Sequence, residues 1–489
     1  MKSALMALGA SALLLSAGPA SISGQRGSEA PKPQPRRVFA PGSSPATISE
    51  ILGRPTDRSV TANALSDEDV DVFYEYGTQP GIYSGKTQTA RHPGGKPTES
   101  VIDGLQPDTR YYYRPRTRRP GEAEFTAGEE RSFVTQRARG RTFRFDVEAD
   151  PHLDENSDPD LFRRTLQNIL EDDPDFLIDL GDTFFSEKLP VVNEATVLAR
   201  HLYLRTFFDK TSPSVPLFLA LGNHEGELGS LLNGTANNLA VWAARARILH
   251  FPNPLPDGFY SGDLAPAPFV GLRQNYYSWE WGDALFVVLD PYWYTTVKSA
   301  TDNWTVTLGA AQYLWLKSVL ENSSARFKFV FCHQLVGGDG KDGRGGAEAA
   351  RYFEWGGSNA DGSWGFGDRR AGWDRPVHRL LVENRATIFF HGHDHFFAKQ
   401  DLDGIVYQLV PQPGHPGTGN ATQAASYGYQ SGIFFPSSGH LRITVSGDHL
   451  TVEYIRAFRP QDENQGHING ELAYSYSIPA AAKKGGIRR

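Results

Sequence analysis

Five short apolar runs, each ending in polar residues, stand out in the hydrophobic pattern of the chain. The runs FRFDVEA, DFLIDL, PLFLAL, FKFVFC and ATIFFH directly precede Asp150, Gly181, Gly222, His333 and Gly392. Runs of this length and composition are typical of buried strands in a sheet that is covered on both faces. In open α/β sheets, ligands bind outside the carboxyl ends of the strands. The pattern therefore predicts a sheet edge at which several polar segments meet.

Helical signals alternate with these strands over residues 142–458, which predicts a layered α/β domain. One helix is expected to start with Asp158 as N-cap and Pro159 at its first position. Its apolar face is formed by Leu161, Leu166, Ile169 and Leu170. A second helix is predicted over residues 309–320, and a hairpin over residues 440–455.

Residues 55–137 show a different pattern, with short strands separated by turn signals. Evenly spaced short strands of this kind predict a small β-sandwich. The segment LQPDTRYYY, residues 105–113, resembles the corner before the sixth strand of fibronectin type III domains. This resemblance implies that the hydroxyl of Tyr111 bonds back to the backbone upstream.

The two ends of the chain have their own composition. Residues 1–24 combine Lys2, an apolar run and small residues, which predicts a signal peptide and a secreted or periplasmic protein. No later segment is apolar enough to span a membrane. The segment 25–54 is predicted as a linker because its first half is rich in Pro, Arg and Gly, and residues 459–489 as a C-terminal tail.

Composition narrows the function classes. The 489-residue chain has a formal net charge of −7 and therefore gives no strong signal for nucleic-acid binding. With 39% hydrophobic residues it can bury a large core, and its single cysteine, Cys332, excludes an intrachain disulfide. The oligomeric state stays open.

The polar residues at the strand ends are of the types that bind divalent transition metals: carboxylates, imidazoles and one amide. Each motif alone has an ordinary interpretation, since Asp-Pro favours a turn and a single histidine is more often a core residue. Five such motifs in order make a metal site the better interpretation. The candidate ligands are Asp150, His152, Asp182, Asn223, His333, His393 and His395.

The ordered motifs DPH, GD, GNHE, H and GHDH resemble those of the calcineurin-like metallophosphoesterase superfamily, which includes the purple acid phosphatases. The resemblance implies a β-sandwich followed by an αββα catalytic domain that binds two divalent metal ions, with Mn, Zn and Fe as candidates. Asp182 would bridge both metals. The first metal would be held by Asp150, His152 and His395, and the second by Asn223, His333 and His393.

One position departs from the purple acid phosphatases. Their iron-binding tyrosine lies three residues after the bridging aspartate, where this chain has Phe185. A phenyl ring cannot bind a metal, so we expect a colourless site in which His152 takes the place of that ligand.

The expected chemistry is hydrolysis of a small phosphate ester. Two divalent cations lower the pKa of a bridging water, and the resulting hydroxide can attack the phosphorus of a phosphomonoester directly. His224, which follows a ligand, is the candidate general acid, with Glu225 as a candidate to orient it. A phosphodiesterase with the same metal core and a non-catalytic surface-binding protein are the alternatives.

The stretch 337–373 reads as a long insertion and is the expected source of substrate contacts. Its candidates for such contacts are Asp339, Arg344, Arg351, Trp364 and Trp373. Any one of them is more often a solvated surface residue than a substrate contact.

Overall fold

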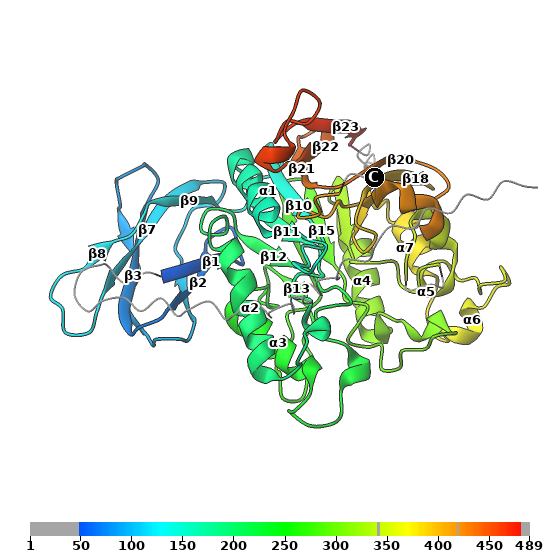
Figure 1. The fold of residues 1–489 in the computed structure, drawn as a ribbon, viewed down its shortest axis with the longest axis horizontal. Coiled ribbons are helices and arrows are strands. Elements are labelled where there is room, and N and C mark those ends of the chain that lie inside the picture. The colour runs from blue at the N-terminus through cyan, green and yellow to red at the C-terminus, as the bar shows by residue number, and fades with distance from the viewer. Residues whose placement is uncertain (1–47, 340–342, 418–419, 481–489) are drawn as a thin grey trace, which may run out of the picture. The chain divides into compact units, whose positions relative to one another are not determined.

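The computed structural model describes residues 48–339, 343–417 and 420–480, all of which lie in the unit Pro45–Arg489 (Figure 1). The predicted signal peptide lies outside these residues. Among the helices of the described segments, none is both long and apolar enough to cross a membrane.

The N-terminal region is the predicted β-sandwich. One sheet has the order β1-β2-β6, and the other has β4-β3-β7-β8, with β5 paired to β3 and β9 to β7. The backbone N–H of Gln106 donates to the hydroxyl of Tyr111 over 2.9 Å, as expected for a corner tyrosine. The strands are β1 Ile48–Gly53, β2 Val60–Ser66, β3 Val70–Gly77, β4 Gly85–Lys86, β5 Ala90–His92, β6 Thr98–Ile102, β7 Arg110–Arg118, β8 Thr126–Ala127 and β9 Arg131–Val134.

Two predicted boundaries differ from the structure. Strand β1 lies inside the segment predicted as a linker (25–54), because its buried Ile51 and Leu52 pair it with β2 and join it to the core. Strand β23, Leu472–Pro479, lies inside the predicted C-terminal tail (459–489) and pairs with strand β22, His449–Arg456. Its mixed aromatic and polar residues are only half-buried, so no strong apolar run marks the strand in the sequence.

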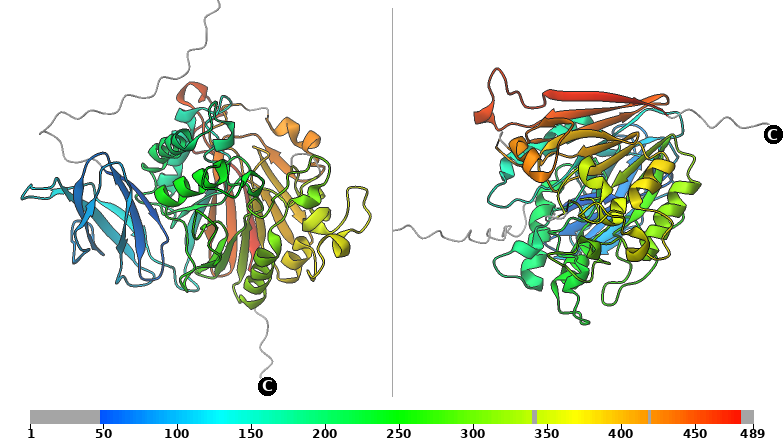
Figure 2. Two further views of the ribbon diagram at one scale, coloured as in Figure 1. Left: turned by 90° about the horizontal axis from the view of Figure 1, so that it is seen from below. Right: turned by 90° about the vertical axis from the view of Figure 1, so that its right-hand side faces the viewer.

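The second region contains two facing sheets, with strand orders β12-β11-β10-β21-β22-β23 and β13-β14-β15-β16-β17-β19-β18-β20 (Figure 2). Strands β10 to β12 are mutually parallel, and so are β15, β16, β17 and β19. The bounds are β10 Phe143–Glu148, β11 Leu177–Asp179, β12 Leu217–Leu219, β13 Ser261–Gly262, β14 Tyr277–Trp281, β15 Ala284–Val288, β16 Phe327–Phe331, β17 Ile388–His391, β18 Phe397–Leu402, β19 Ile405–Leu409, β20 Ile433–Phe435, β21 Gly439–Val445 and β22 His449–Arg456.

An aromatic core lies between the two sheets. Phe145 of β10 sits 5.0 Å from Phe286 of β15 and 5.3 Å from Phe329 of β16, measured between ring centroids. All three side chains are buried, and each removes a large apolar area from water. This packing fixes the position of one sheet against the other, and with it the positions of their strand ends.

Helices cover the outer faces of both sheets, which confirms the αββα arrangement. Buried side chains of α1 and α2 pack on the first sheet, while those of α4 and α7 pack on the second. The predicted N-cap Asp158 accepts the N–H groups of Asp160 and Leu161. The helices are α1 Pro159–Asp172, α2 Glu194–Phe208, α3 Leu239–His250, α4 Gly309–Asn322, α5 Phe353–Gly356, α6 Phe366–Arg369 and α7 Val377–Glu383.

A buried polar junction joins the sandwich to the first helical layer. The guanidinium of Arg205 in α2 donates to the carbonyl of Ser49 over 2.9 Å and to the amide oxygen of Asn63 over 2.8 Å. Glu50 of β1 lies in the same junction and is only 5% exposed. Burial is the largest influence on Glu50 and raises the pKa of its carboxyl to about 7, although Tyr74 and the nearby arginines act in the opposite direction.

Candidate metal centre

The five polar segments converge at one place, just after strands β10, β11, β12, β16 and β17. Oδ2 of Asp182, in the loop after β11, lies 3.2 Å from Nε2 of His333 and 3.3 Å from Nε2 of His152. His333 follows β16 in the second sheet, whereas His152 follows β10 in the first. Asp182 therefore lies between groups delivered by the two sheets.

Most of the seven predicted ligands, Asp182 among them, form two triads. The two triads each place one ligand atom per residue within 4.8 Å of the others: Asp150, His152 and His395, and Asp182, His333 and His393. This division matches the one that the sequence motifs imply. Asn223 and His393 line the same cavity. The structure thus brings the candidate residues together, and their role as ligands stays a prediction.

Unpartnered atoms test whether a cation fits this donor set. Oδ1 of Asn223 is buried and forms no hydrogen bond, and Nε2 of His333 is buried with only the carboxylate of Asp182 beside it, at 3.2 Å. Such groups are costly to bury unless something satisfies them. A nitrogen-and-oxygen donor set with these atoms suits divalent transition metals.

The charges of the centre fit the same interpretation. Burial acts to raise the pKa of the Asp182 carboxyl, but the charge of His333 and the other imidazoles outweighs it and lowers that pKa well below the usual range. Burial lowers the pKa of His393 to about 3. The aspartate is therefore anionic and His393 is neutral, which are the forms in which these side chains bind metals. Burial acts to lower the pKa of His333, but the charges of Asp182 and Asp150 raise it to about 9, so a cation would have to displace a proton from that ring.

Five of the seven candidate ligands have a left-handed backbone conformation. The spacing of two within the Asp150/His152 and His393/His395 pairs suits an extended segment, on which both side chains would project to one side, but the structure has tight turns there instead. The φ angles of Asp150, His152, Asp182, His393 and His395 are 60°, 50°, 56°, 76° and 67°. Because few non-glycine residues adopt this region, the side chains are aimed by tight turns rather than by strand alternation.

Glycines in the motifs make room for the carboxylates. A Cβ atom on Gly222 would collide with Oδ1 of Asp182, and one on Gly392 would lie 2.7 Å from Oδ2 of Asp150. The glycine in GNHE and the one in GHDH are thus required by close approach.

The candidate acid His224 has a different partner from the one predicted. Its Nδ1 atom lies 2.8 Å from Oε1 of Glu187, in the 3-10 turn Ser186–Lys188. Glu225 instead accepts backbone N–H groups, from Thr183 over 2.6 Å and from Asp182 over 3.1 Å. Glu225 therefore braces the loop that carries Asp182 and does not orient His224. No motif in the sequence marks Glu187.

Phe185, which stands where the purple acid phosphatases have their iron-binding tyrosine, packs against two histidines. Its ring centroid lies 4.6 Å from that of His152 and 4.6 Å from that of His224. The phenyl ring thus supports a candidate ligand and the candidate acid at once.

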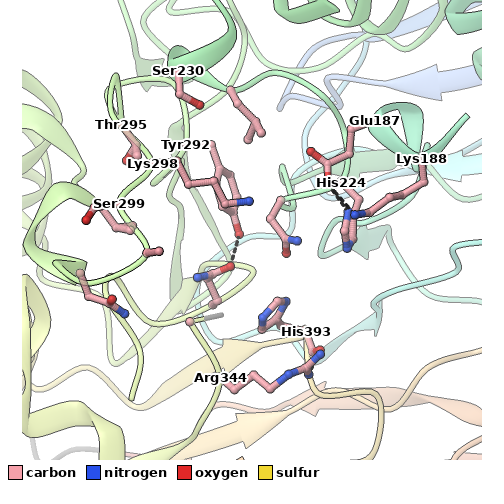
Figure 3. Close-up of a pocket in the computed structure, with 17 residues that line it drawn as sticks. Glu187, Lys188, His224, Ser230, Tyr292, Thr295, Lys298, Ser299, Arg344 and His393 are labelled. Atoms are coloured by element: carbon pink, nitrogen blue, oxygen red, sulfur yellow. Dashed lines mark hydrogen bonds and ion pairs between the residues drawn. The ribbon is translucent and has the colours of Figure 1, made fainter. Parts of the chain in front are cut away.

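A cavity of about 810 Å³ opens beside Asn223, His224 and His393 (Figure 3). Its lining includes the cationic side chains Lys188, Lys298 and Arg344. Sequence reasoning missed the two lysines, which lie outside every motif.

The insertion contributes one of its five candidates to this cavity. Arg344 lines it and donates to Oδ1 of Asp394 over 2.8 Å. Trp373 stacks on Tyr313 at 4.0 Å, Arg351 bonds the hydroxyl of Tyr352, and Trp364 is 64% exposed. The lining includes neither these three residues nor Asp339.

Comparisons with known proteins agree with this geometry. A family model described as calcineurin-like phosphoesterase matches residues 143–397. No curated protein matches the chain. Among solved structures, one titled as PhoD has a TM-score of 0.64 at 14% identity, covering 90% of this chain and 92% of that chain. The purple acid phosphatase PPD1 from yellow lupin (Lupinus luteus) seeds has a TM-score of 0.55 at 15% identity, with coverages of 89% and 74%. At these identities the likeness concerns the fold.

Proposed function

The chain belongs to the calcineurin-like phosphoesterase family and is a metal-dependent phosphoester hydrolase, and on this premise we propose that it is an exported phosphomonoesterase with a dinuclear centre and His224 as general acid. The observation that supports the catalytic part most directly is the position of His224. Its Nε2 atom lies 4.0 Å from Oδ2 of Asp182, and its Nδ1 atom contacts Glu187.

In this proposal the two triads hold two divalent cations, with Asn223 added to the second and Asp182 shared by both. Mn, Zn and Fe suit a set of imidazole, carboxylate and amide donors. Divalent cations bound there would supply a nucleophilic water of lowered pKa and offset charge on the phosphoryl oxygens.

The chain's own residues then orient the ester and protonate its leaving group. His224 lines the cavity beside Asn223, where Nε2 can give its proton to the leaving oxygen. Oε1 of Glu187 accepts a hydrogen bond from Nδ1 of His224, which fixes the orientation of the ring. The hydrogen bond and charge of His224 in turn lower the pKa of Glu187, against the opposing and larger single influence of burial. Glu187 therefore remains a carboxylate.

The charge of the cavity favours a monoester over a diester. A phosphomonoester carries roughly 1.5 to 2 negative charges near neutral pH, whereas a diester carries about one. Lys188, Lys298 and Arg344 line the cavity, where Lys188 lies 3.4 Å from Glu187 and Arg344 lies 2.8 Å from Asp394, so cationic side chains outnumber the one acidic side chain of the lining. A guanidinium also suits bidentate contact with phosphate oxygens.

The export proposal is supported by the sequence alone. Lys2, the apolar run that follows it and the small residues near Ala20 are typical of a cleaved signal. N-terminal sequencing of protein recovered outside the cytoplasm tests it: an intact Met1 there would contradict cleavage.

The catalytic proposal is tested with metal-reconstituted protein on p-nitrophenyl phosphate and bis(p-nitrophenyl) phosphate. We expect the larger kcat/KM on the monoester and loss of both activities in Asp182→Asn. A larger kcat/KM on the diester would replace the monoesterase with a diesterase. If wild-type protein is no faster than Asp182→Asn on either substrate, catalysis at this centre is contradicted.

A further inference from the structure

A second cluster of metal-binding residue types lies outside the candidate metal centre. It consists of Asp146 on β10, Asp172 at the end of α1 and His440 on β21. One ligand atom from each lies within 4.8 Å of the other two. Nε2 of His440 is 2.9 Å from Oδ2 of Asp172 and 3.6 Å from Oδ2 of Asp146. None of the sequence motifs includes these three residues.

Asp146 is the residue whose surroundings require an explanation. Its side chain is fully buried, at 0% exposure, and neither carboxylate oxygen forms a hydrogen bond. A buried carboxylate without partners is strongly unfavourable. Glu148, two residues along the same face of β10, is equally buried, and both of its oxygens are also without partners. Burial is the largest cause that raises the pKa of both carboxyls well above their usual range, so without a cation the two groups would have to hold protons.

The nearby arginines bond to Asp172 and Glu453 and give no hydrogen bond to Asp146. Arg442 donates to Oδ1 of Asp172 over 2.7 Å and to Oε2 of Glu453 over 2.9 Å. Arg144 donates to the backbone carbonyl of Asp172. A protonated His440 would explain the contact with Asp172, but it would leave both oxygens of Asp146 unsatisfied.

We propose that Asp146, Asp172 and His440 form a separate binding site for a divalent transition-metal cation such as Zn²⁺ or Mn²⁺. A cation about 2.1 Å from each donor atom requires donor separations of about 3 to 4 Å. The two separations from His440, 2.9 and 3.6 Å, meet this requirement. They also resemble those in the candidate metal centre, where Nε2 of His333 lies 3.2 Å from Asp182 and 3.7 Å from Asp150.

The location gives this site a structural role. It joins β10, α1 and β21, and β10 is the strand that leads directly to Asp150. A bound ion would hold the end of α1 against two neighbouring strands of the first sheet. Because a ligand that binds only the folded state stabilises it, the ion would raise the unfolding temperature of the whole unit.

Metal stoichiometry tests the proposal on the full-length protein. Metal-free wild type, Asp146→Asn and His440→Gln are dialysed against Zn²⁺, and bound metal per chain is measured by elemental analysis. We expect each variant to bind one ion fewer than wild type. His449→Gln is the matched control, since His449 lies on the neighbouring strand β22 with a half-exposed side chain and should bind as wild type does. Equal stoichiometry in all four proteins would overturn the proposal.

A second measurement separates this site from the candidate metal centre. The triple variant His152→Gln, Asp182→Asn, His333→Gln removes donors from that centre while leaving Asp146, Asp172 and His440 intact. We expect it to retain one ion, visible by Co²⁺ absorption, and its unfolding temperature to rise when Co²⁺ is added. Asp146→Asn changes the charge of the side chain but hardly its volume. Added to the triple variant, it should abolish both the retained ion and the rise in unfolding temperature. No retained ion, or an ion that survives Asp146→Asn, would overturn the proposal even if the other variants misfold.

Discussion

The Nδ1 atom of His224 lies 2.8 Å from Oε1 of Glu187. The two residues come from different loops, since His224 follows β12 and Glu187 lies beyond β11. A carboxylate at this distance fixes the ring of a histidine, as carboxylate partners do in many active sites. This pair gives the first two predictions.

Replacing His224 by alanine should affect substrates according to their leaving groups. For an alkyl phosphate, whose leaving oxygen must be protonated, we expect kcat to fall roughly 10²–10⁴-fold. For p-nitrophenyl phosphate the loss should be far smaller because the leaving phenolate needs no proton. Steady-state kinetics on both substrates checks this. Equal losses on the two substrates would remove His224 from the role of general acid.

Replacing Glu187 by alanine should reduce the alkyl phosphatase rate by roughly 10- to 100-fold, the range for residues that orient a functional histidine. If Glu187 acts by positioning the ring of His224, Glu187→Ala should lower the rate little further in a protein that already carries His224→Ala. A double-mutant cycle in kcat measures this. Additive losses would show that Glu187 acts independently of His224. Glu187→Gln, which keeps an acceptor oxygen, should recover part of the rate.

Replacing Asp182 by asparagine should lower metal content and activity together. Asp182 belongs to one triad and its Oδ2 atom lies 3.3 Å from Nε2 of His152 in the other, so the change removes the anionic donor that we propose to be shared. We expect a loss of at least ~10²-fold in kcat/KM, comparable to the removal of one preorganised electrostatic group. Chelation of wild-type protein should cause a similar loss that added Mn²⁺ or Zn²⁺ reverses. Full activity after complete metal removal would contradict the metal-dependent mechanism.

Replacing Arg344 should mainly affect substrate binding. In the proposed function Arg344 makes one charge-assisted contact to phosphate, which Arg344→Gln would remove, and we expect KM to rise by roughly 10- to 100-fold. Asp394 keeps hydrogen bonds from Tyr429 and from the N–H of Gly345, so the local fold should survive. Arg351→Gln is the control because Arg351 lies in the same insertion but outside the cavity. A KM that changes equally in both variants would argue against phosphate contact by Arg344.

The stability of the sandwich junction should depend on pH through Glu50. Burial raises the pKa of this carboxyl from 4.5 to about 7 in the folded protein, so the folded state retains a proton that the unfolded chain loses earlier. The stabilisation is fully present below pH 4.5 and is lost as the pH rises through 7, by about 3 kcal/mol at most. Glu50→Gln should therefore be more stable than wild type at pH 8, with most of that advantage gone at pH 5. Unfolding curves at both pH values test this, and a pH-independent difference would contradict it.

The sequence predicts the strand-end residues well because residue type and a local apolar run are sufficient to identify them. Asp150, Asn223 and His333 each follow a buried strand directly, and parallel strands bring their ends together without further information. The same local logic identifies α1, where Asp158 and Pro159 give a strong start signal.

The remaining features depend on contacts between distant segments. Glu187 is a single acid in a short turn, 37 residues before His224, and nothing local distinguishes it from a surface glutamate. Sequence adjacency wrongly favoured Glu225, whose carboxylate turns toward backbone N–H groups instead. The cluster of Asp146, Asp172 and His440 spans 294 positions, the difference between 440 and 146, and no motif joins them.

The left-handed turns at five candidate ligands imply a conflict between durability and catalysis. Each such conformation at a non-glycine residue costs about 1–3 kcal/mol, and it persists because the surrounding fold imposes it. Glycine at Asp150 or His395 would relieve that cost while deleting a donor atom. Laboratory evolution under heat selection alone should therefore accumulate inactive, more heat-resistant descendants at these positions, whereas selection for turnover should keep the costly residues.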